Sequence, residues 1–257
     1  MILSEQPVLQ VNNLTLRAGQ KILIDDLSFL LYAGERLCLL GASGSGKSLT
    51  AQALTGTLPP GITVSGEILV NGIDVAHQPA LQRSTAGRVA AIFQDSASAL
   101  HPLFTVAKQL KWVAGSAQQG SLSTLLDAAG LHGLGDRYPG ELSGGQRQRI
   151  CALMALLSSS NVLVADEPTT ALDVVAQQQV TTLLQQGKQA LLFITHDIAV
   201  AARLCQRVVI LEQGVAIENG SMQRILRSPQ QPFTRTLIAA ARQNSDLILT
   251  ARQALAG

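Results

Sequence analysis

The 257-residue chain has few cysteines, and their spacing suits no covalent or metal framework. Only three are present, Cys38, Cys151 and Cys205. An odd number of widely spaced cysteines without a Cys-x-x-Cys pair supports neither a disulfide scaffold nor a zinc site. In a reducing compartment such thiols serve as small buried apolar residues. We therefore expect all three in the core.

Charge and long apolar runs are also scarce. Charged residues make up 14% of the chain, against about 25% in an average soluble protein, and the formal net charge is +2. This balance leaves no basic footprint, so we expect no nucleic-acid partner. The charge-free stretch 150–165 contains three serines and an asparagine, whereas a membrane-spanning helix needs roughly 20 mostly apolar residues. Residues 1–10 lack the basic and apolar blocks of a signal peptide, so none is expected.

Hydrophobic patterning predicts strands in two styles. The first 35 residues alternate apolar and polar side chains, as antiparallel strands do. Two hairpins are predicted, one over 65–75 with Asn71-Gly72 at its turn and one over 207–218 with Gly214 at its turn. Continuous apolar runs predict buried parallel strands. These runs are 36–40, 162–165 and 190–195.

The middle of the chain is patterned differently. Segments 121–129 and 144–157 are predicted as helices, and the second follows the i, i+3, i+4, i+7 rule. We expect residues 94–155 to form a helical insertion within an α/β core. A Pro/Gln-rich break begins at Ser228 and an Ala-rich amphipathic tail follows it.

A glycine-rich loop carries the first chemical signal. Residues 41–48 match G-x-x-x-x-G-K-[ST], between an apolar strand and a helix-compatible segment. Such a loop curls its backbone N–H groups around phosphate oxygens at a helix N-terminus. Lys47 is expected to reach the β- and γ-phosphates of a nucleotide, and Ser48 to ligate Mg²⁺. The loop alone does not distinguish kinases, GTPases and ATPases. The predicted nucleotide-binding residues here are Gly41, Ala42, Ser43, Gly44, Ser45, Gly46, Lys47, Ser48 and Leu49.

Two adjacent carboxylates end the apolar run 162–165. Asp166 at the strand end can hold Mg²⁺ directly or through water. Glu167 can then polarise a water molecule aligned with the γ-phosphate. The pair therefore predicts nucleotide hydrolysis, with Glu167 as the catalytic base.

A second anion-binding segment opens the helix 144–157. Ser143 takes the N-cap position, and Gly144, Gly145 and Gln146 follow it. The chain thus has one complete nucleotide-binding loop and a second segment that could bind phosphate. We infer that the second segment binds the nucleotide of a neighbouring subunit.

With these motifs the sequence resembles the ATP-binding-cassette (ABC) ATPases over nearly its whole length. Leu142–Gln146, followed by Arg147-Gln148-Arg149, looks like their signature motif. The resemblance implies an α/β fold: a P-loop NTPase ABC ATPase core with an antiparallel β subdomain and a helical insertion subdomain. It also implies a head-to-tail dimer, with ATP held between one subunit's phosphate loop and the other's signature.

The resemblance assigns roles to three further residues. Gln94 looks like the family's glutamine loop, which binds Mg²⁺ or the attacking water. Asp173 looks like the aspartate loop, which links the two nucleotide sites. His196 looks like the switch histidine, which contacts the γ-phosphate.

One position departs from the family pattern. Similar ATPases place an aromatic residue just before Gly19 to stack on adenine, and this chain has Arg17. Either the Arg17 guanidinium lies on the base, or the phosphates carry most of the affinity. An ordinary solvated arginine in a hairpin is the third alternative.

The resemblance also implies a domain plan and a place in a transporter. The whole chain, 1–257, is expected to be one ABC ATPase domain. Residues 1–93 and 156–227 would form the nucleotide-binding core with the β subdomain, 94–155 the helical subdomain, and 228–257 a C-terminal tail. The chain would sit at the cytoplasmic face of the inner membrane. Its partners would be transmembrane permease subunits, a second ABC ATPase of the same or a homologous chain and, indirectly, an extracytoplasmic substrate-binding protein.

The cargo is less firmly marked. Segments 95–102, 171–177 and 228–238 resemble importers of peptides, nickel and metal chelates. Segments 47–50 and 58–61 resemble the nickel-import ATPases more than the oligopeptide ones, so nickel or a metal chelate is the first expectation. A peptide importer is the alternative. A non-transport ABC ATPase and an exporter cassette are further alternatives, ranked below it. Candidate contacts with the permease are Leu103, Phe104, Val106 and Trp112.

Overall fold

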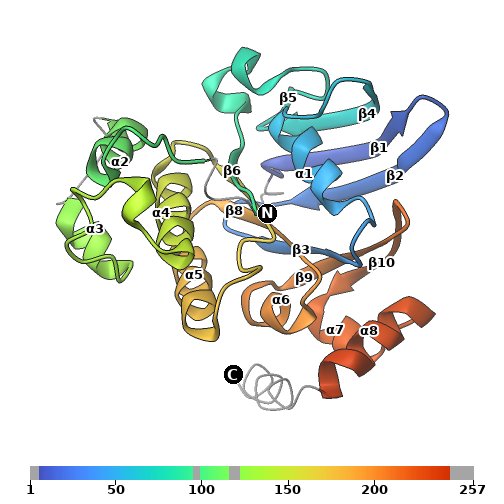
Figure 1. The fold of residues 1–257 in the computed structure, drawn as a ribbon. Helices are drawn as coiled ribbons and strands as arrows, with labels where there is room; N and C mark the ends of the chain where they lie inside the picture. Colours follow the sequence, from blue (N-terminus) through green and yellow to red (C-terminus); the bar gives the residue numbers. More distant parts are fainter. Residues whose placement is uncertain (1–5, 95–98, 116–121, 244–257) are drawn as a thin grey trace, which may run out of the picture.

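The computed structural model describes residues 6–94, 99–115 and 122–243. In this part of the chain the strands form one ten-stranded sheet with the order β5-β4-β1-β2-β10-β9-β3-β8-β7-β6 (Figure 1). One end of the sheet is antiparallel and the other is mainly parallel, so the two strand styles predicted from the sequence share one sheet.

The antiparallel end is built from the first hairpins. Cross-strand pairs such as Leu9↔Leu31 join β1 to β2, and pairs such as Leu9↔Val70 join β1 to β4. The predicted turn Asn71-Gly72 is confirmed, with φ of 49° and 78°. The strands are β1 (Leu9–Ala18), β2 (Lys21–Leu31), β4 (Ile62–Val70) and β5 (Ile73–Asp74).

The parallel core contains the three predicted apolar strands. They are confirmed, and β3 and β7 each extend one residue further than predicted. The second hairpin is also confirmed. A single register pair, Val215↔Asp25, joins it to the antiparallel end. The strands are β3 (Arg36–Gly41), β6 (Ala90–Ile92), β7 (Val162–Asp166), β8 (Ala190–Thr195), β9 (Arg207–Glu212) and β10 (Val215–Ser221).

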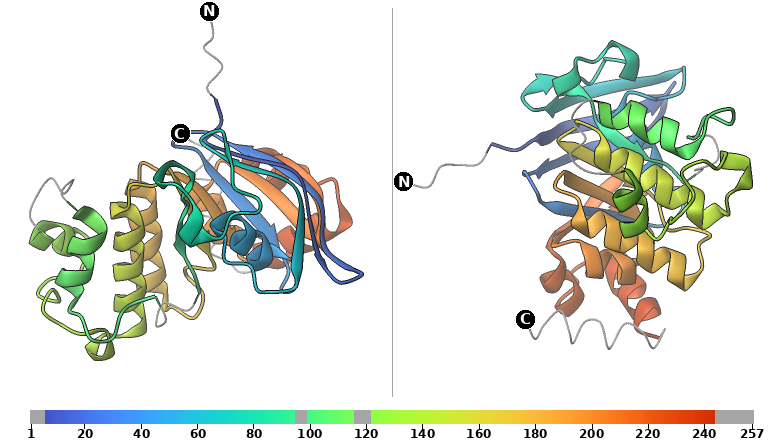
Figure 2. Two further views of the ribbon diagram at one scale, coloured as in Figure 1. Left: turned by 90° about the horizontal axis from the view of Figure 1, so that it is seen from above. Right: turned by 90° about the vertical axis from the view of Figure 1, so that its left-hand side faces the viewer.

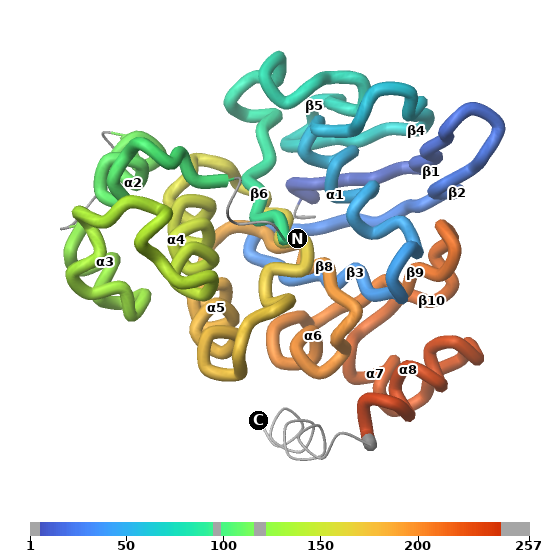
Figure 3. Tube along the Cα trace, viewed as in Figure 1, coloured from blue at the N-terminus to red at the C-terminus, as the bar shows by residue number. Residues whose placement is uncertain are grey.

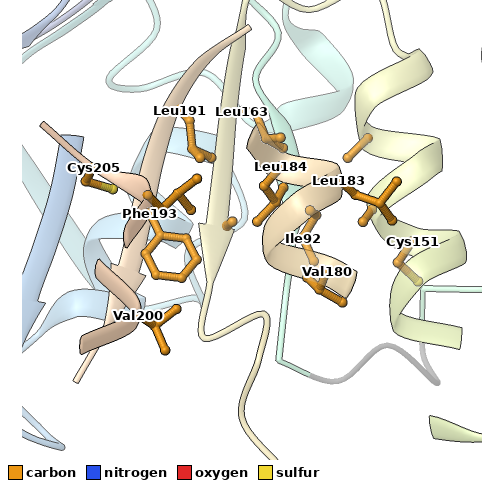
Figure 4. Close-up of a cluster of buried hydrophobic side chains, with 14 of the residues drawn as sticks. Ile92, Cys151, Leu163, Val180, Leu183, Leu184, Leu191, Phe193, Val200 and Cys205 are labelled. Atoms are coloured by element: carbon orange, nitrogen blue, oxygen red, sulfur yellow. The ribbon is translucent and has the colours of Figure 1, made fainter. Parts of the chain in front are cut away.

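Strand alternation divides the buried side chains between two clusters. Leu37 and Leu39 of β3 join the cluster that also holds residues of α1 (Lys47–Thr55). Cys38 and Leu40 join the cluster that lies against the other helices. Figure 4 shows part of this second cluster, with Phe193 near Val200 and Cys205. All three cysteines are buried, as predicted.

The helices on one side of the core follow the chain order. After β6 the chain leaves the sheet for α2, α3 and α4, and it returns in β7 (Figures 2 and 3). The predicted helix 144–157 is confirmed at both ends. The other predicted helix is confirmed over Leu122–Ala128, and Ala129 lies in the turn that follows. The helices are α2 (Val106–Ala114), α3 (Leu122–Ala128), α4 (Gly144–Leu157), α5 (Val174–Gln186), α6 (Ile198–Leu204), α7 (Met222–Arg227) and α8 (Pro232–Gln243).

The surface of α2 differs from the prediction at one position. Val106 is only 1% exposed, because it is the first residue of α2 and turns into the core. Val106 is therefore too buried to be the permease contact that was expected from the sequence. Leu103 is 75% exposed and Trp112 56% exposed, while Phe104 is half-buried.

Among the described helices, none combines the length and the apolar character that crossing a membrane requires.

Candidate functional site

The parallel register brings the predicted functional loops to one edge of the sheet. Leu40 lies opposite Thr195, Asp166 opposite Ile194 and Ile92 opposite Ala165. The carboxyl ends of β3, β8, β7 and β6 are therefore level, and each is followed by a predicted motif. Ligands of α/β proteins bind at such an edge.

The phosphate loop owes its shape to glycine. Gly46 is the N-cap of α1 and has φ of 102°, which other residues rarely adopt. A Cβ on Gly46 would also overlap the Cδ1 atom of Ile24 in β2. Gly44 has φ of 78°. The loop thus lies directly against β2, and its backbone N–H groups gather at the start of α1, where an anion is favoured.

Lys47 is held inside this loop. Its Nζ donates to the carbonyl oxygens of Gly41 and Ala42, at 2.9 Å each. Burial lowers the pKa of Lys47, and the carboxylates of Glu167 and Asp166 oppose that shift. The backbone carbonyl groups of the loop therefore hold the Lys47 ammonium group inside the loop. The group also interacts electrostatically with the carboxylates of Glu167 and Asp166.

Asp166 and Ser48 form the natural place for a hard cation. Burial raises the pKa of Asp166, and a hydrogen bond from the Ser48 hydroxyl opposes the shift. The Oδ1 atom of Asp166 is buried without a hydrogen-bond partner. A hydroxyl beside a carboxylate with a free oxygen fits Mg²⁺, which binds few protein oxygens together with phosphate. Elsewhere in the described residues no cluster of three or more His, Cys, Asp or Glu side chains could hold a metal.

Glu167 is the most constrained side chain of the site. Its φ of 49° lies in the left-handed region, and its backbone N–H donates to the carbonyl oxygen of Ile194 at 2.9 Å. Its Oε1 lies 2.8 Å from Nδ1 of His196, and its Oε2 accepts from the Thr170 hydroxyl at 2.8 Å. Both carboxylate oxygens are therefore held by neighbouring side chains, and His196 and Glu167 lie within hydrogen-bond distance of each other.

A cavity of about 410 Å³ opens beside the loop. It is lined by Lys21, Ile22, Leu23, Gly44, Gly46, Lys47, Ser48, Leu49 and Gln213. No aromatic side chain is among the described residues that line it. Arg17 is not a lining residue either, whereas its cross-strand partner Ile22 is.

The second anion-binding segment lies apart from this cavity, since none of residues 143–146 lines it. Ser143 caps α4 as predicted. Its Oγ accepts from the N–H of Gln146 at 3.2 Å, and Oε1 of Gln146 accepts from the N–H of Ser143 at 2.8 Å. This reciprocal capping box holds Ser143 at the surface.

Asp173 lies close to that segment. A Cβ on Gly145 would stand 3.0 Å from Cβ of Ala176, so the starts of α4 and α5 are in contact. Oδ1 of Asp173 accepts from the N–H of Ala176 at 2.8 Å, which makes Asp173 the N-cap of α5. The Asp173 carboxylate therefore has a local structural partner.

Gln94 is exposed and lies two residues beyond the end of β6. The register places it at the same edge as Asp166, but no side-chain hydrogen bond joins it to the other site residues described. Residues 95–98, which contribute to the importer-like segment 95–102, lie outside the described residues.

Sequence reasoning missed several members of the site. Thr170 was missed although it stands one short turn after Glu167. Lys21, Ile22 and Gln213 were missed because only the packing of β2 and the β9–β10 turn against the loop brings them to the cavity.

Comparisons with known proteins identify the family of this chain. The family model described as ABC transporter matches residues 24–170. The chain is 38% identical over 91% of its length to the peptidoglycan transport ATP-binding protein YejF of Agrobacterium fabrum, of which it spans 47%. It is 37% identical over 91% of its length to the oligopeptide transport ATP-binding protein OppD of Haemophilus influenzae, of which it spans 79%. Its length is thus about half that of some of the curated relatives it matches.

A solved structure shares the fold. The dimeric structure of a post-hydrolysis state of the ATP-binding cassette MJ0796, bound to ADP and Pi, superposes with a TM-score of 0.69. It is 25% identical, and the match covers 83% of this chain and 98% of that one. The predicted fold class is confirmed. The chain belongs to the ABC transporter family and carries that family's ATPase domain.

Proposed function

We propose that this chain is the ATP-hydrolysing subunit of a membrane importer and that it works in a dimer of two such subunits. The observation that carries the proposal is the division of the site. The phosphate loop, Asp166, Glu167 and His196 meet at one edge of the sheet. The phosphate loop lines the cavity there, and none of residues 143–146 does. A second subunit, of the same or a homologous chain, would supply its signature to this site.

Each residue then has a task set by its surroundings. The loop N–H groups and Lys47 bind the β- and γ-phosphates. Glu167, fixed by Thr170 and His196, accepts a proton from the attacking water. His196 holds that carboxylate and contacts the γ-phosphate, and Gln94 orients the water. Ser48, Asp166 and Gln94 would hold Mg²⁺, which neutralises charge on the phosphates.

Binding and hydrolysis of ATP would close and open the dimer in turn. A nucleotide that touches both subunits favours the closed state, and hydrolysis removes that preference. Asp173, at the start of α5 beside the signature, would connect the two sites. The closing motion would drive permease subunits that contact the exposed Leu103 and Trp112, with the chain peripheral at the cytoplasmic face of the inner membrane.

For cargo we propose peptides. The relatives described above are named for peptidoglycan and oligopeptide transport. They favour the peptide alternative over the nickel expectation that segments 47–50 and 58–61 raised. An extracytoplasmic binding protein would deliver the peptide to the permease.

Uptake measurements separate the cargo classes. A strain that lacks this chain is expected to lose uptake of radiolabelled di- or oligopeptide, and the wild-type chain to restore it, while the Glu167→Gln chain does not. Nickel uptake, with and without chelator, should stay unchanged. Loss of nickel uptake with intact peptide uptake would reverse the cargo proposal, and loss of neither would contradict the importer role.

If two subunits share each ATP site, a mutation in the signature segment should lower ATP hydrolysis without changing ATP binding by the isolated chain. Ser143→Asp keeps an N-cap residue but places a carboxylate where the neighbour's γ-phosphate would lie. Hydrolysis by the assembled complex should fall by about tenfold or more, since such like-charge contacts cost over about 1.4 kcal/mol. ATP affinity of the isolated chain should not change.

The matched control is Ser221→Asp, because Ser221 is also an exposed N-cap, at the start of α7, and lies outside the site. Hydrolysis and binding should both stay at wild-type values in this variant. If Ser143→Asp instead weakens ATP binding by the isolated chain as strongly as a phosphate-loop mutation does, the two-subunit site is wrong.

A further inference from the structure

Arg149 is a buried cation at the junction of several segments, although it does not line the cavity. It belongs to α4 and is only 8% exposed. Its Nε donates to the carbonyl oxygen of Gly145 at 3.3 Å. Its Nη1 donates to the carbonyl oxygens of Ala129 and Gly130 at 3.0 and 2.9 Å. The guanidinium group therefore joins the signature segment, residues 143–146, to the turn that follows α3.

The turn after α3 is shaped to receive this guanidinium group. Gly130 has φ of 65°, which residues with a side chain rarely adopt. A Cβ at Gly130 would stand only 2.9 Å from Nη1 of Arg149, so any side chain there would displace the guanidinium group. Glycine at this position thus lets the arginine reach carbonyl groups beyond the end of the helix.

The Asp173 carboxylate is the charge that acts on this buried cation. Burial lowers the pKa of Arg149, and the Asp173 carboxylate opposes that shift. Asp173 caps α5 through Oδ1. Among the hydrogen bonds of the described residues, none engages Oδ2 of Asp173 or Nη2 of Arg149. Each group therefore keeps a polar atom that can be directed at the other.

The aspartate loop, residues 167–173, connects Asp173 to the catalytic base. The loop is hydrogen-bonded along its length: the N–H of Thr170 donates to the carbonyl oxygen of Glu167 at 3.2 Å. The N–H of Leu172 donates to that of Thr169 at 3.3 Å. The Thr170 hydroxyl also donates to Oε2 of Glu167 at 2.8 Å. A displacement of Asp173 can therefore reach the Glu167 carboxylate through a few short bonds.

Given the two-subunit ATP site proposed above, we propose that Arg149 is a positioning residue that holds the signature segment and the aspartate loop as one unit. It bonds to the first through Gly145 and attracts the second through Asp173. The signature segment would contact the neighbour's γ-phosphate, while the aspartate loop leads to this subunit's own Glu167. Arg149 would thus couple the neighbour's nucleotide to this subunit's catalytic base.

The test is a double-mutant cycle on ATP hydrolysis by the assembled complex of full-length chains. Arg149→Met removes the guanidinium group, and Asp173→Asn removes the charge but keeps a good N-cap. Each variant should lower kcat about tenfold, and the double variant should also be about tenfold slower rather than about a hundredfold, because the two residues act as a pair. Arg149→Lys, which keeps a positive charge near Asp173, should recover part of the loss.

ATP affinity of the isolated chain separates positioning from general damage. Arg149 and Asp173 do not line the cavity, so the ATP dissociation constants of both single variants should stay within about threefold of wild type. Arg207→Met is the matched control, because Arg207 also joins a carbonyl oxygen, that of Leu30, to a carboxylate, that of Glu35. Arg207 lies at the amino end of β9, away from the site. The control should leave kcat unchanged, alone and combined with Asp173→Asn.

Three results would overturn this role for Arg149. They are a folded Arg149→Met complex with wild-type kcat, a double variant about a hundredfold slower than wild type, which is the product expected of independent sites, and a loss of ATP affinity in the isolated Arg149→Met chain. If a thermal melt shows that the methionine variant does not fold, Arg149→Gln replaces it in the same cycle, since glutamine keeps a donor for the carbonyl groups.

These outcomes are distinct from a failure of the proposed function. Each of them leaves hydrolysis by the wild-type complex, and its loss in Ser143→Asp, intact. Wild-type turnover by the Ser143→Asp complex would instead contradict the two-subunit site on which the role of Arg149 rests.

Discussion

Replacing Glu167 with glutamine is expected to lower ATP hydrolysis by about 10²–10⁴-fold, the usual worth of a general base, while ATP affinity stays within about threefold of wild type. Glutamine has the same shape, so its carbonyl oxygen can still accept from Thr170, which now lies 2.8 Å from Oε2. It cannot take a proton from water. The residue stands beside the cation site rather than on the phosphate loop, so binding should survive.

The same variant should accumulate as an ATP-bound dimer, because hydrolysis is the step that opens the proposed dimer. Phosphate release measures turnover, calorimetry measures affinity, and size-exclusion chromatography with light scattering in ATP detects the dimer. Glu67→Gln, at an exposed β4 carboxylate that accepts from Asn12, is the matched control and should behave as wild type. If Glu167→Gln hydrolyses ATP at the wild-type rate, Glu167 is not the catalytic base.

Local sequence was sufficient for the parts of the site that local geometry determines. The glycine pattern of the phosphate loop predicts its fold because Gly44 and Gly46 need positive φ. The Ser143 cap was predictable because a capping box involves only residues three apart. The convergence of the loops after β3, β7 and β8 also followed, since parallel strands present their carboxyl ends at one edge.

Features that depend on distant packing were not predictable. The three-residue strand β6 is too short for a periodicity signal. Val106 was expected to contact the permease together with Leu103 and Trp112, yet α2 begins at Val106 and buries its side chain. The cavity wall joins Ile22 of β2 to Gln213 of the β9–β10 turn, almost two hundred residues away in sequence, through hydrogen bonds that involve the backbone of Ser45 and Asp25. No local pattern encodes that contact.

Lys47 belongs to the phosphate loop and lies near Asp166 and Glu167, which stand at the end of a distant strand. Lys47→Ala is expected to weaken ATP binding by about a hundredfold. Two charge-assisted phosphate contacts of about 1.5 kcal/mol each would be lost. Burial lowers the pKa of Lys47 while Glu167 and Asp166 oppose that shift, and added phosphate charges would favour the ammonium form further. The loss of this buried cation would also leave Asp166 and Glu167 near the triphosphate with less compensating positive charge.

Calorimetric titration with Mg-ATP measures the effect, and a thermal melt separates it from unfolding. Lys188→Ala, at an exposed lysine outside the cavity, is the control and should bind as wild type does. The variant loses the two hydrogen bonds from Lys47 to the carbonyl oxygens of Gly41 and Ala42, each of about 1 kcal/mol, so the melting temperature should fall by a few degrees. A folded Lys47→Ala chain with undiminished ATP affinity would show that these residues do not form the phosphate cradle.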